Sequence, residues 1–85
     1  MLYDIVDVKV IKDYIINILF ENGVEGKIDI SKIIPFKGIF TKLKDKQYFS
    51  TVYVNKDLGT IVWDNGADIS PSFLYEVISQ TNAST

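Results

Sequence analysis

Residues Gly59 to Tyr75 read GTIVWDNGADISPSFLY, and this stretch carries the signals of a strand, a turn and a capped helix. Ile61 and Trp63 fall on the same side of an extended segment, because side chains alternate along a strand. Asn65 and Gly66 tolerate positive φ angles, so a tight turn is expected directly after the strand. The chain is therefore predicted to leave a strand, turn sharply and enter a helix.

The start of the predicted helix is marked by Ser70 and Pro71. A serine side chain accepts a hydrogen bond from a free N–H of the first turn, and proline at the first helical position loses no hydrogen bond and has its φ already set. Ile69 and Leu74 have the spacing of a hydrophobic staple across this helix start. The helix is expected to end near Ser79. Its apolar stripe is predicted to consist of Phe73, Leu74, Val77 and Ile78.

Two strands are predicted in the first twenty residues of the chain. Alternation from Ile5 to Ile11 predicts the first strand, because a period of two is typical of a half-buried strand. This strand is expected to place Val6, Val8 and Val10 on one face. The β-branched and aromatic residues from Tyr14 to Phe20 predict the second strand. It is expected to present Tyr14, Ile16, Ile18 and Phe20 on one face and Ile15, Asn17 and Leu19 on the other.

The turn at Glu21-Asn22-Gly23 predicts a hairpin, and the register of the hairpin decides its loop length. A two-residue loop would pair Phe20 with Glu25 and mix apolar with charged groups on one face. A three-residue loop, with Gly23 in the left-handed conformation, pairs Phe20 with Val24 instead. We therefore expect the longer loop and a third strand from Val24 to Ile30. In this register Ile18 lies opposite Gly26, Ile16 lies opposite Ile28, and Glu25, Lys27 and Asp29 face water.

The middle of the chain predicts short helical turns followed by a second hairpin. Ser31 is expected to cap a brief helical turn that Pro35 stops, and Asp45 to Ser50 is expected to form another turn. Tyr48 and Phe49 are expected to hold this second turn against the core. The strands from Thr51 to Asn55 and from Thr60 to Asp64 form the hairpin. Its four-residue loop pairs Val54 with Ile61 and Val52 with Trp63.

These elements predict an α+β fold. About five antiparallel strands, in the order of three strands, short helical turns and a hairpin, are expected to form a small sheet that packs with the C-terminal helix. A chain of 85 residues with 47% hydrophobic content supports one core, so residues 1–80 are expected to form a single domain. Residues 81–85 are small and polar, and we expect a frayed tail there.

Composition excludes several classes of chemistry. The chain has no cysteine, which rules out disulfides, thiolate catalysis and zinc–sulfur sites. It has no histidine either, so serine triads and cysteine–histidine dyads are absent. The first ten residues carry acidic groups and alternate, unlike a signal peptide, and no apolar run approaches the ~18 residues of a membrane span. We therefore expect a cytoplasmic protein.

The charge balance disfavours nucleic acid as the main partner. Nine basic residues, all lysine, stand against eleven acidic ones, whereas phosphate binding favours a net positive face and arginine. Lys37, Lys42, Lys44 and Lys46 form a local cluster, which is more typical of a solvated surface. The alternative interpretation is a nucleic-acid-associated regulator that uses the patch from Lys37 to Lys46.

The sequence resembles a bacterial domain of unknown function called DUF2442 from about Val6 to Tyr75. The likeness lies in a FENG turn after the second strand, a KIDIS segment at the end of the third, and the GTIVWDNGADISPSFLY stretch. The first hairpin contributes Phe20, Gly23 and Asp29. The most specific residues, in their order and spacing, are Trp63, Asn65, Gly66, Asp68, Pro71, Leu74 and Tyr75.

The resemblance implies a compact α+β fold with an antiparallel sheet, like the amino-terminal domain that some members carry ahead of a helix-turn-helix. The sequence ends at Thr85, so DNA binding by appended helices is not carried over. The resemblance also implies a neighbouring gene for another small protein, in an arrangement that looks like a toxin–antitoxin pair. It supplies no catalytic residues.

Metal binding and acid–base catalysis are two chemical roles that the acidic residues could have in place of structural ones. Asp64, Asn65 and Asp68 offer oxygen ligands for a hard cation, but their spacing departs from a calcium loop. We expect Asn65 and Asp68 to satisfy backbone N–H groups of the turn instead. If Asp29, Asp64 and Asp68 converged, two of them could serve as a carboxylate pair for acid–base work, but a chain with one core has little room for a substrate cleft. No catalytic, metal or cofactor site is expected, and the protein is not expected to be an enzyme.

The remaining interpretation is an interaction module, the antitoxin-like or accessory half of a two-protein unit. Ile15 and Leu19 point away from the main apolar face, so they must meet a partner, a second copy or another part of the chain. Trp63 is expected in the core. Tyr75 lies at the edge of the helix stripe and could offer its hydroxyl to a partner or to Asp68. We expect another small protein as partner, with a homo-oligomer as an open alternative.

Overall fold

The computed structural model describes the backbone of residues 3–83 and the side chains of residues 3–80. Three strands come first: β1 (Ile5–Lys12), β2 (Ile15–Phe20) and β3 (Glu25–Asp29). A short connector region holds the 3₁₀ turns Ile30–Lys32 and Gly38–Lys44 and the single-turn helix α1 (Lys46–Phe49). The hairpin strands β4 (Tyr53–Asn55) and β5 (Thr60–Val62) and the helix α2 (Pro71–Ala83) follow.

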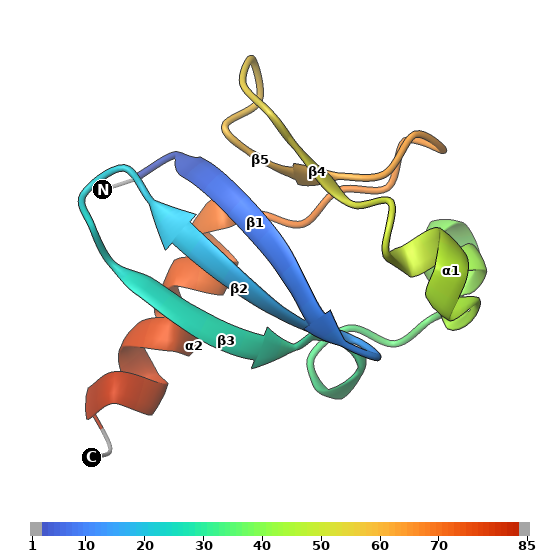
Figure 1. The fold of residues 1–85 in the computed structure, drawn as a ribbon, viewed down its shortest axis with the longest axis horizontal. Coiled ribbons are helices and arrows are strands. Elements are labelled where there is room, and N and C mark those ends of the chain that lie inside the picture. The colour runs from blue at the N-terminus through green and yellow to red at the C-terminus, as the bar shows by residue number, and fades with distance from the viewer. Residues whose placement is uncertain (1–2, 84–85) are drawn as a thin grey trace.

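The α+β class is confirmed, and the five antiparallel strands divide into two sheets. One sheet has the order β1-β2-β3 and the other is the β4-β5 hairpin. Figure 1 shows α2 behind the three-stranded sheet and α1 beyond the end of β1, on the same side of the molecule as the chain leading into β4. No helix of the described residues is long and apolar enough to cross a membrane.

The register predicted for the first hairpin is confirmed. The N–H of Phe20 donates to the carbonyl of Val24 at 2.8 Å, and Gly23 has a φ of 91°. A side chain is rarely tolerated at such a φ, so the glycine is what permits this loop. Ile18 lies opposite Gly26, and Ile16 lies opposite Ile28. The three-residue loop thus keeps the apolar side chains of β2 on the face that is buried.

The placement of Val6 was predicted wrongly, because β1 contains a bulge. Ile5 pairs with Phe20 and Asp7 pairs with Leu19, so Val6 is an extra residue in the ladder. The bulge reverses the alternation, which buries Ile5 and leaves Val6 51% exposed. Val8 and Val10 remain on the inner face, opposite Ile18 and Ile16.

Helix α2 begins as the sequence predicts. The Oγ of Ser70 accepts a hydrogen bond from the N–H of Phe73 at 3.4 Å, and Ile69 and Leu74 are both buried. The predicted stripe needs one correction, since Phe73 is 39% exposed whereas Leu74 and Ile78 are buried. The helix also continues past Ser79 to Ala83. The frayed tail expected at residues 81–85 lies outside the residues whose side chains the structure describes, so it stays a prediction.

The cap of the first 3₁₀ turn is Asp29, not Ser31 as expected. The Oδ1 of Asp29 accepts hydrogen bonds from the backbone N–H of Ser31 at 3.0 Å and from its hydroxyl at 2.5 Å. The second helical turn is confirmed as α1, which Asp45 caps by accepting from the N–H of Gln47 at 3.0 Å. The 3₁₀ turn Gly38–Lys44 lies in a segment without a clear periodic pattern of apolar residues.

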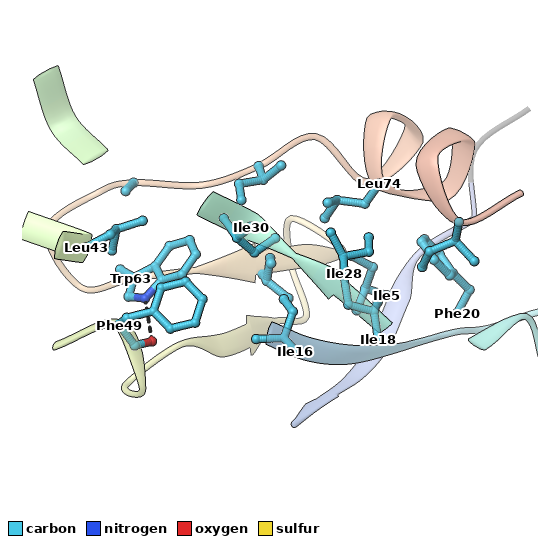
Figure 2. Close-up of a cluster of buried hydrophobic side chains, with 14 residues drawn as sticks. Ile5, Ile16, Ile18, Phe20, Ile28, Ile30, Leu43, Phe49, Trp63 and Leu74 are labelled. Carbon is cyan, nitrogen blue, oxygen red and sulfur yellow. Dashed lines mark hydrogen bonds between the residues drawn. The ribbon is translucent and has the colours of Figure 1, made fainter. Parts of the chain in front are cut away.

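The core lies between the two sheets, α1 and α2, and Trp63 is buried within it. The indole N–H donates to the carbonyl of Phe49 at 2.9 Å, as Figure 2 shows, so the polar edge of the ring is satisfied. Val54 pairs with Ile61, as predicted for the second hairpin. The residues that fill the core are Ile5, Ile16, Ile18, Phe20, Ile28, Ile30, Leu43, Phe49, Ile61, Trp63, Ala67, Ile69, Leu74 and Ile78.

Candidate functional site

The turn after β5 is closed by its own hydrogen bonds. Asn65 accepts from the N–H of Ala67 at 3.1 Å through Oδ1, and donates to the carbonyl of Ile39 at 3.1 Å through Nδ2. Gly66 follows with a φ of 93°. The expected role of Asn65 in satisfying backbone groups is therefore seen. Asp68 does not share that role, because its backbone bridges to Val62 while its carboxylate makes no hydrogen bond to the described residues.

Asp64 is held in place by Tyr48. The hydroxyl of Tyr48 donates to Oδ1 of Asp64 at 2.5 Å and accepts from the N–H of Asn65 at 3.1 Å. The bond to Asp64 raises the pKa of the Tyr48 phenol above its ordinary value, and burial of the ring adds to the rise. Lys42 places its ammonium 4.7 Å from the centroid of the same ring. The Tyr48 hydroxyl from α1 thus orients the carboxylate of Asp64, and the N–H of Asn65 holds that hydroxyl.

A hollow of about 200 Å³ opens on the outer face of the β4-β5 hairpin. Tyr53 lies opposite Val62 across the hairpin, and Val62 bridges to Asp68 on its other side, so these three residues form a row. Val62 is buried and lines the hollow. We call this the hairpin hollow. The residues that line it are Tyr53, Asn55, Leu58, Val62, Trp63, Asp64, Gly66 and Asp68.

Exposed apolar side chains gather at the hairpin hollow. Tyr53 is 47% exposed and Leu58 is 57% exposed, and both line it. Ile39 is 50% exposed and lies beside it, since a Cβ built on Gly66 would be 3.7 Å from Ile39 Cδ1. Six large apolar side chains are exposed among the described residues, so this region holds half of them. The other three are Val6, Ile11 and Phe73.

A second hollow, of about 190 Å³, lies where β1 meets the β4-β5 loop. Val6 is the one exposed large apolar side chain of the described residues that lines it. The carboxylate of Glu21, another lining residue, accepts from the N–H of Asp4 at 2.9 Å and so serves the backbone. One exposed large apolar side chain of the described residues thus lines this hollow, whereas two, Tyr53 and Leu58, line the hairpin hollow.

The predicted interaction residues of β2 lie on the outer face of the three-stranded sheet. Ile15 and Leu19 are half-buried. Leu19 lies between Asp7 and Glu25 in neighbouring strands, and Ile15 lies opposite Asp29. Asn17 lies between the two apolar residues along β2, and charged residues flank them in the neighbouring strands, so they do not form a continuous apolar surface.

Tyr75 lies elsewhere and does not reach Asp68 through a hydrogen bond. Its hydroxyl accepts from Nδ2 of Asn22 at 3.1 Å, and its ring contacts Phe20 and Tyr3 with centroids 5.0 and 5.3 Å apart. The side chain ties α2 to the loop between β2 and β3. It is half-buried among these rings rather than directed at solvent.

Sequence reasoning missed Ile39, Tyr53 and Leu58. Two of the three had a signal in the sequence. Leu58 is an apolar residue in the otherwise polar loop Lys56-Asp57-Leu58-Gly59. Tyr53 alternates with Val52 and Val54 in a strand, which already predicts the opposite face for it. Ile39 had no recognisable pattern around it.

Carboxylates do not converge on a metal site in the described residues. Asp29, which would have to join Asp64 or Asp68 to form a carboxylate pair, caps the 3₁₀ turn after β3. Within residues 3–83, no three of the histidine, cysteine, aspartate and glutamate side chains are grouped to hold an ion.

The lysine cluster is partly engaged within the chain. Lys46 forms an ion pair with Asp13 at 3.1 Å, and the bond to Asp13 raises the pKa of the Lys46 ammonium above its ordinary value. Lys42 lies over the ring of Tyr48. Two of the four ammonium groups thus already have intramolecular partners.

Comparison with known proteins identifies a family. The model of a protein family described as "Protein of unknown function (DUF2442)" matches residues 5–79. The chain belongs to the DUF2442 family. No curated protein and no solved structure matches the chain.

The residues that carry the resemblance to DUF2442 fall into two groups: one holds the fold together, and the other forms the turn beside the hairpin hollow. Trp63 and Leu74 are buried in the core, Pro71 opens α2, and Tyr75 ties α2 to the first hairpin. The others, Asn65, Gly66 and Asp68, form the turn at one side of the hairpin hollow.

Proposed function

We propose that this DUF2442 domain is a protein-interaction module that binds another small protein through the hairpin hollow. The main observation is that the exposed side chains of Tyr53 and Leu58 line one hollow and that the exposed Ile39 lies beside it. Apolar side chains scattered singly over a surface are ordinary, whereas a group of them around a hollow is typical of interaction sites.

The residue types also suit a binding surface. Tyrosine is enriched among the residues that contribute most to protein interfaces, because it combines a large apolar ring with a hydroxyl. Tyr53 and Leu58 are together on the outer face of a two-stranded hairpin, so a partner can cover both without opening the core. The proposed role is binding without catalysis, and the absence of histidine and cysteine from the chain supports it.

The partner in this proposal is encoded near the domain, which acts as the antitoxin-like or accessory half of a two-protein unit. The support for this part is the family resemblance of the residues from Trp63 to Tyr75. The hairpin hollow supports only the general part, which is recognition of a protein surface.

The test is affinity purification of the tagged domain from its own host, followed by mass spectrometry and reconstitution with the purified partner. Leu58→Ser and Tyr53→Ser are expected to lose the partner, because each removes apolar surface from the hairpin hollow. Ile11→Ser is the matched control, since Ile11 is an exposed apolar residue of β1 and does not line the hollow. Retention of the partner at equal affinity by both hollow variants would show that binding occurs elsewhere.

A further inference from the structure

We propose that the hairpin hollow receives a cationic side chain, an arginine or a lysine, from the partner protein. This inference rests on the proposed function, because it names the chemical group that enters the same surface. Two features of the hollow support it: exposed apolar side chains and two carboxylates lie together in the lining.

The lining suits the stem of a long basic side chain. Arginine and lysine bury their methylene stems along apolar surface while the charged head stays near water. In the hairpin hollow, Tyr53 and Leu58 supply exposed apolar surface, and Val62 lies between Tyr53 and Asp68. A stem lying along Tyr53 and Val62 leads toward the Asp68 side of the row.

The charge of the hollow suits the positively charged head group of an arginine or lysine side chain. Asp64 and Asp68 both line it, and neither forms an ion pair within the described residues, where Lys46 with Asp13 is the one such pair. Two unneutralised carboxylates attract a cation and repel an anion. Asp64 is already oriented by the Tyr48 hydroxyl, which occupies Oδ1, so its other oxygen can accept from an incoming donor.

The same two carboxylates disfavour anionic and purely apolar groups in the hollow. A phosphate or a carboxylate would meet two like charges, and a purely apolar side chain would cover the carboxylates without a donor for them. A guanidinium offers five N–H donors in a planar fork, which can serve carboxylates on two sides. Arginine is therefore the better of the two basic residues for this place.

The test uses the isotope-labelled full chain and two short peptides, acetyl-Gly-Arg-Gly-amide and the same peptide with citrulline. Citrulline keeps the shape of arginine but has no charge. We expect the arginine peptide to shift amide resonances of residues that line the hairpin hollow, and the citrulline peptide to bind several-fold more weakly. Asp68→Asn is expected to weaken the arginine peptide about two- to five-fold, the range of a partly exposed ion pair. Asp7→Asn, on the outer face of β1, is the matched control and should leave binding unchanged.

Equal binding of the two peptides, no effect of Asp68→Asn, or no shift at the hollow at the highest peptide concentration would each overturn the inference. The spectra also show whether each variant is folded, so a loss through unfolding is recognised directly. If Leu58→Ser loses the natural partner while the arginine peptide does not bind, the proposed function stands and only the cationic group is wrong.

Discussion

At the scale of single residues, polar groups around the core form hydrogen bonds with partners that are distant in the sequence. Trp63 donates to the carbonyl of Phe49, and Tyr48 donates to Asp64. Both contacts join the single-turn helix α1 to the segment after β5. The sequence predicts that Tyr48 and Phe49 hold α1 to the core, but it does not indicate which polar atoms they meet, because those atoms come together only when the chain folds.

The Tyr48–Asp64 bond predicts a pH dependence. The pKa of Tyr48 is raised from its ordinary value of 10.0, chiefly by the bond to Asp64. The neutral phenol is favoured in the folded state, so its contribution to stability is complete below pH 10 and is lost as pH rises through the higher folded pKa. In an absorbance titration of the phenolates, Tyr48→Phe should remove a component that lies above pH 10.

Asp64→Asn should move that component back toward the ordinary pKa of a tyrosine, because it removes the negative charge beside the phenol. Asp7→Asn changes the net charge equally at a distant place and serves as the control. A wild-type titration in which Tyr48→Phe removes no component above pH 10 would contradict the assignment.

At the scale of elements, the fit between α2 and the three-stranded sheet depends on a glycine. A Cβ built on Gly26 of β3 would lie 2.8 Å from Cγ2 of Ile78 and 3.2 Å from its Cγ1. Ile78 is buried, so it has little room to move away. The absence of a side chain at position 26 thus lets the helix approach the strand closely.

Gly26→Ala is expected to destabilise the domain by about 1–3 kcal/mol, the usual cost of overpacking a core. Urea unfolding measures the free energy. The same change in an Ile78→Ala background should cost much less, because the branched carbons that the new methyl meets are gone, and the pair of residues should therefore be coupled. An equal cost in both backgrounds would show that the close contact is not the cause.

The elements also show what local patterns can and cannot predict. The loop of the first hairpin, the helix start at Ser70 and the Val54–Ile61 pair were predicted, because each is specified by neighbours in sequence. The bulge at Val6 was not. Ile5 donates its N–H to the carbonyl of Gly59 at 2.9 Å, so the start of β1 is fixed by the second hairpin, which lies more than fifty residues further on.

At the scale of the whole molecule, the core and the hairpin hollow are largely separate. Ile61 of β5 is fully buried, whereas Leu58, three residues earlier, is the most exposed of the large apolar side chains described. The hollow itself combines the β4-β5 hairpin and the turn at Gly66, and Ile39 lies beside it. A sequence pattern identifies the hairpin and the turn one by one but not the surface they form together.

This separation predicts that the surface can be changed without loss of the fold. Leu58→Ser should change the free energy of unfolding by less than about 0.5 kcal/mol, as is usual for exposed positions. Ile61→Ala should cost about 2–5 kcal/mol, because it leaves a cavity in the core. Chemical denaturation of both variants tests the contrast, and a large loss with Leu58→Ser would mean that this surface supports the fold.

The domain has a single tryptophan, Trp63, which belongs both to the core and to the lining of the hairpin hollow. Its ring is buried beside Phe49, with centroids 5.6 Å apart, yet Trp63 also lines the hairpin hollow. The intrinsic fluorescence of the protein therefore comes from one known place. A shift of its emission on unfolding reports the core, and a smaller change at constant fold reports a molecule arriving at the hairpin, so no added dye is needed to follow either event.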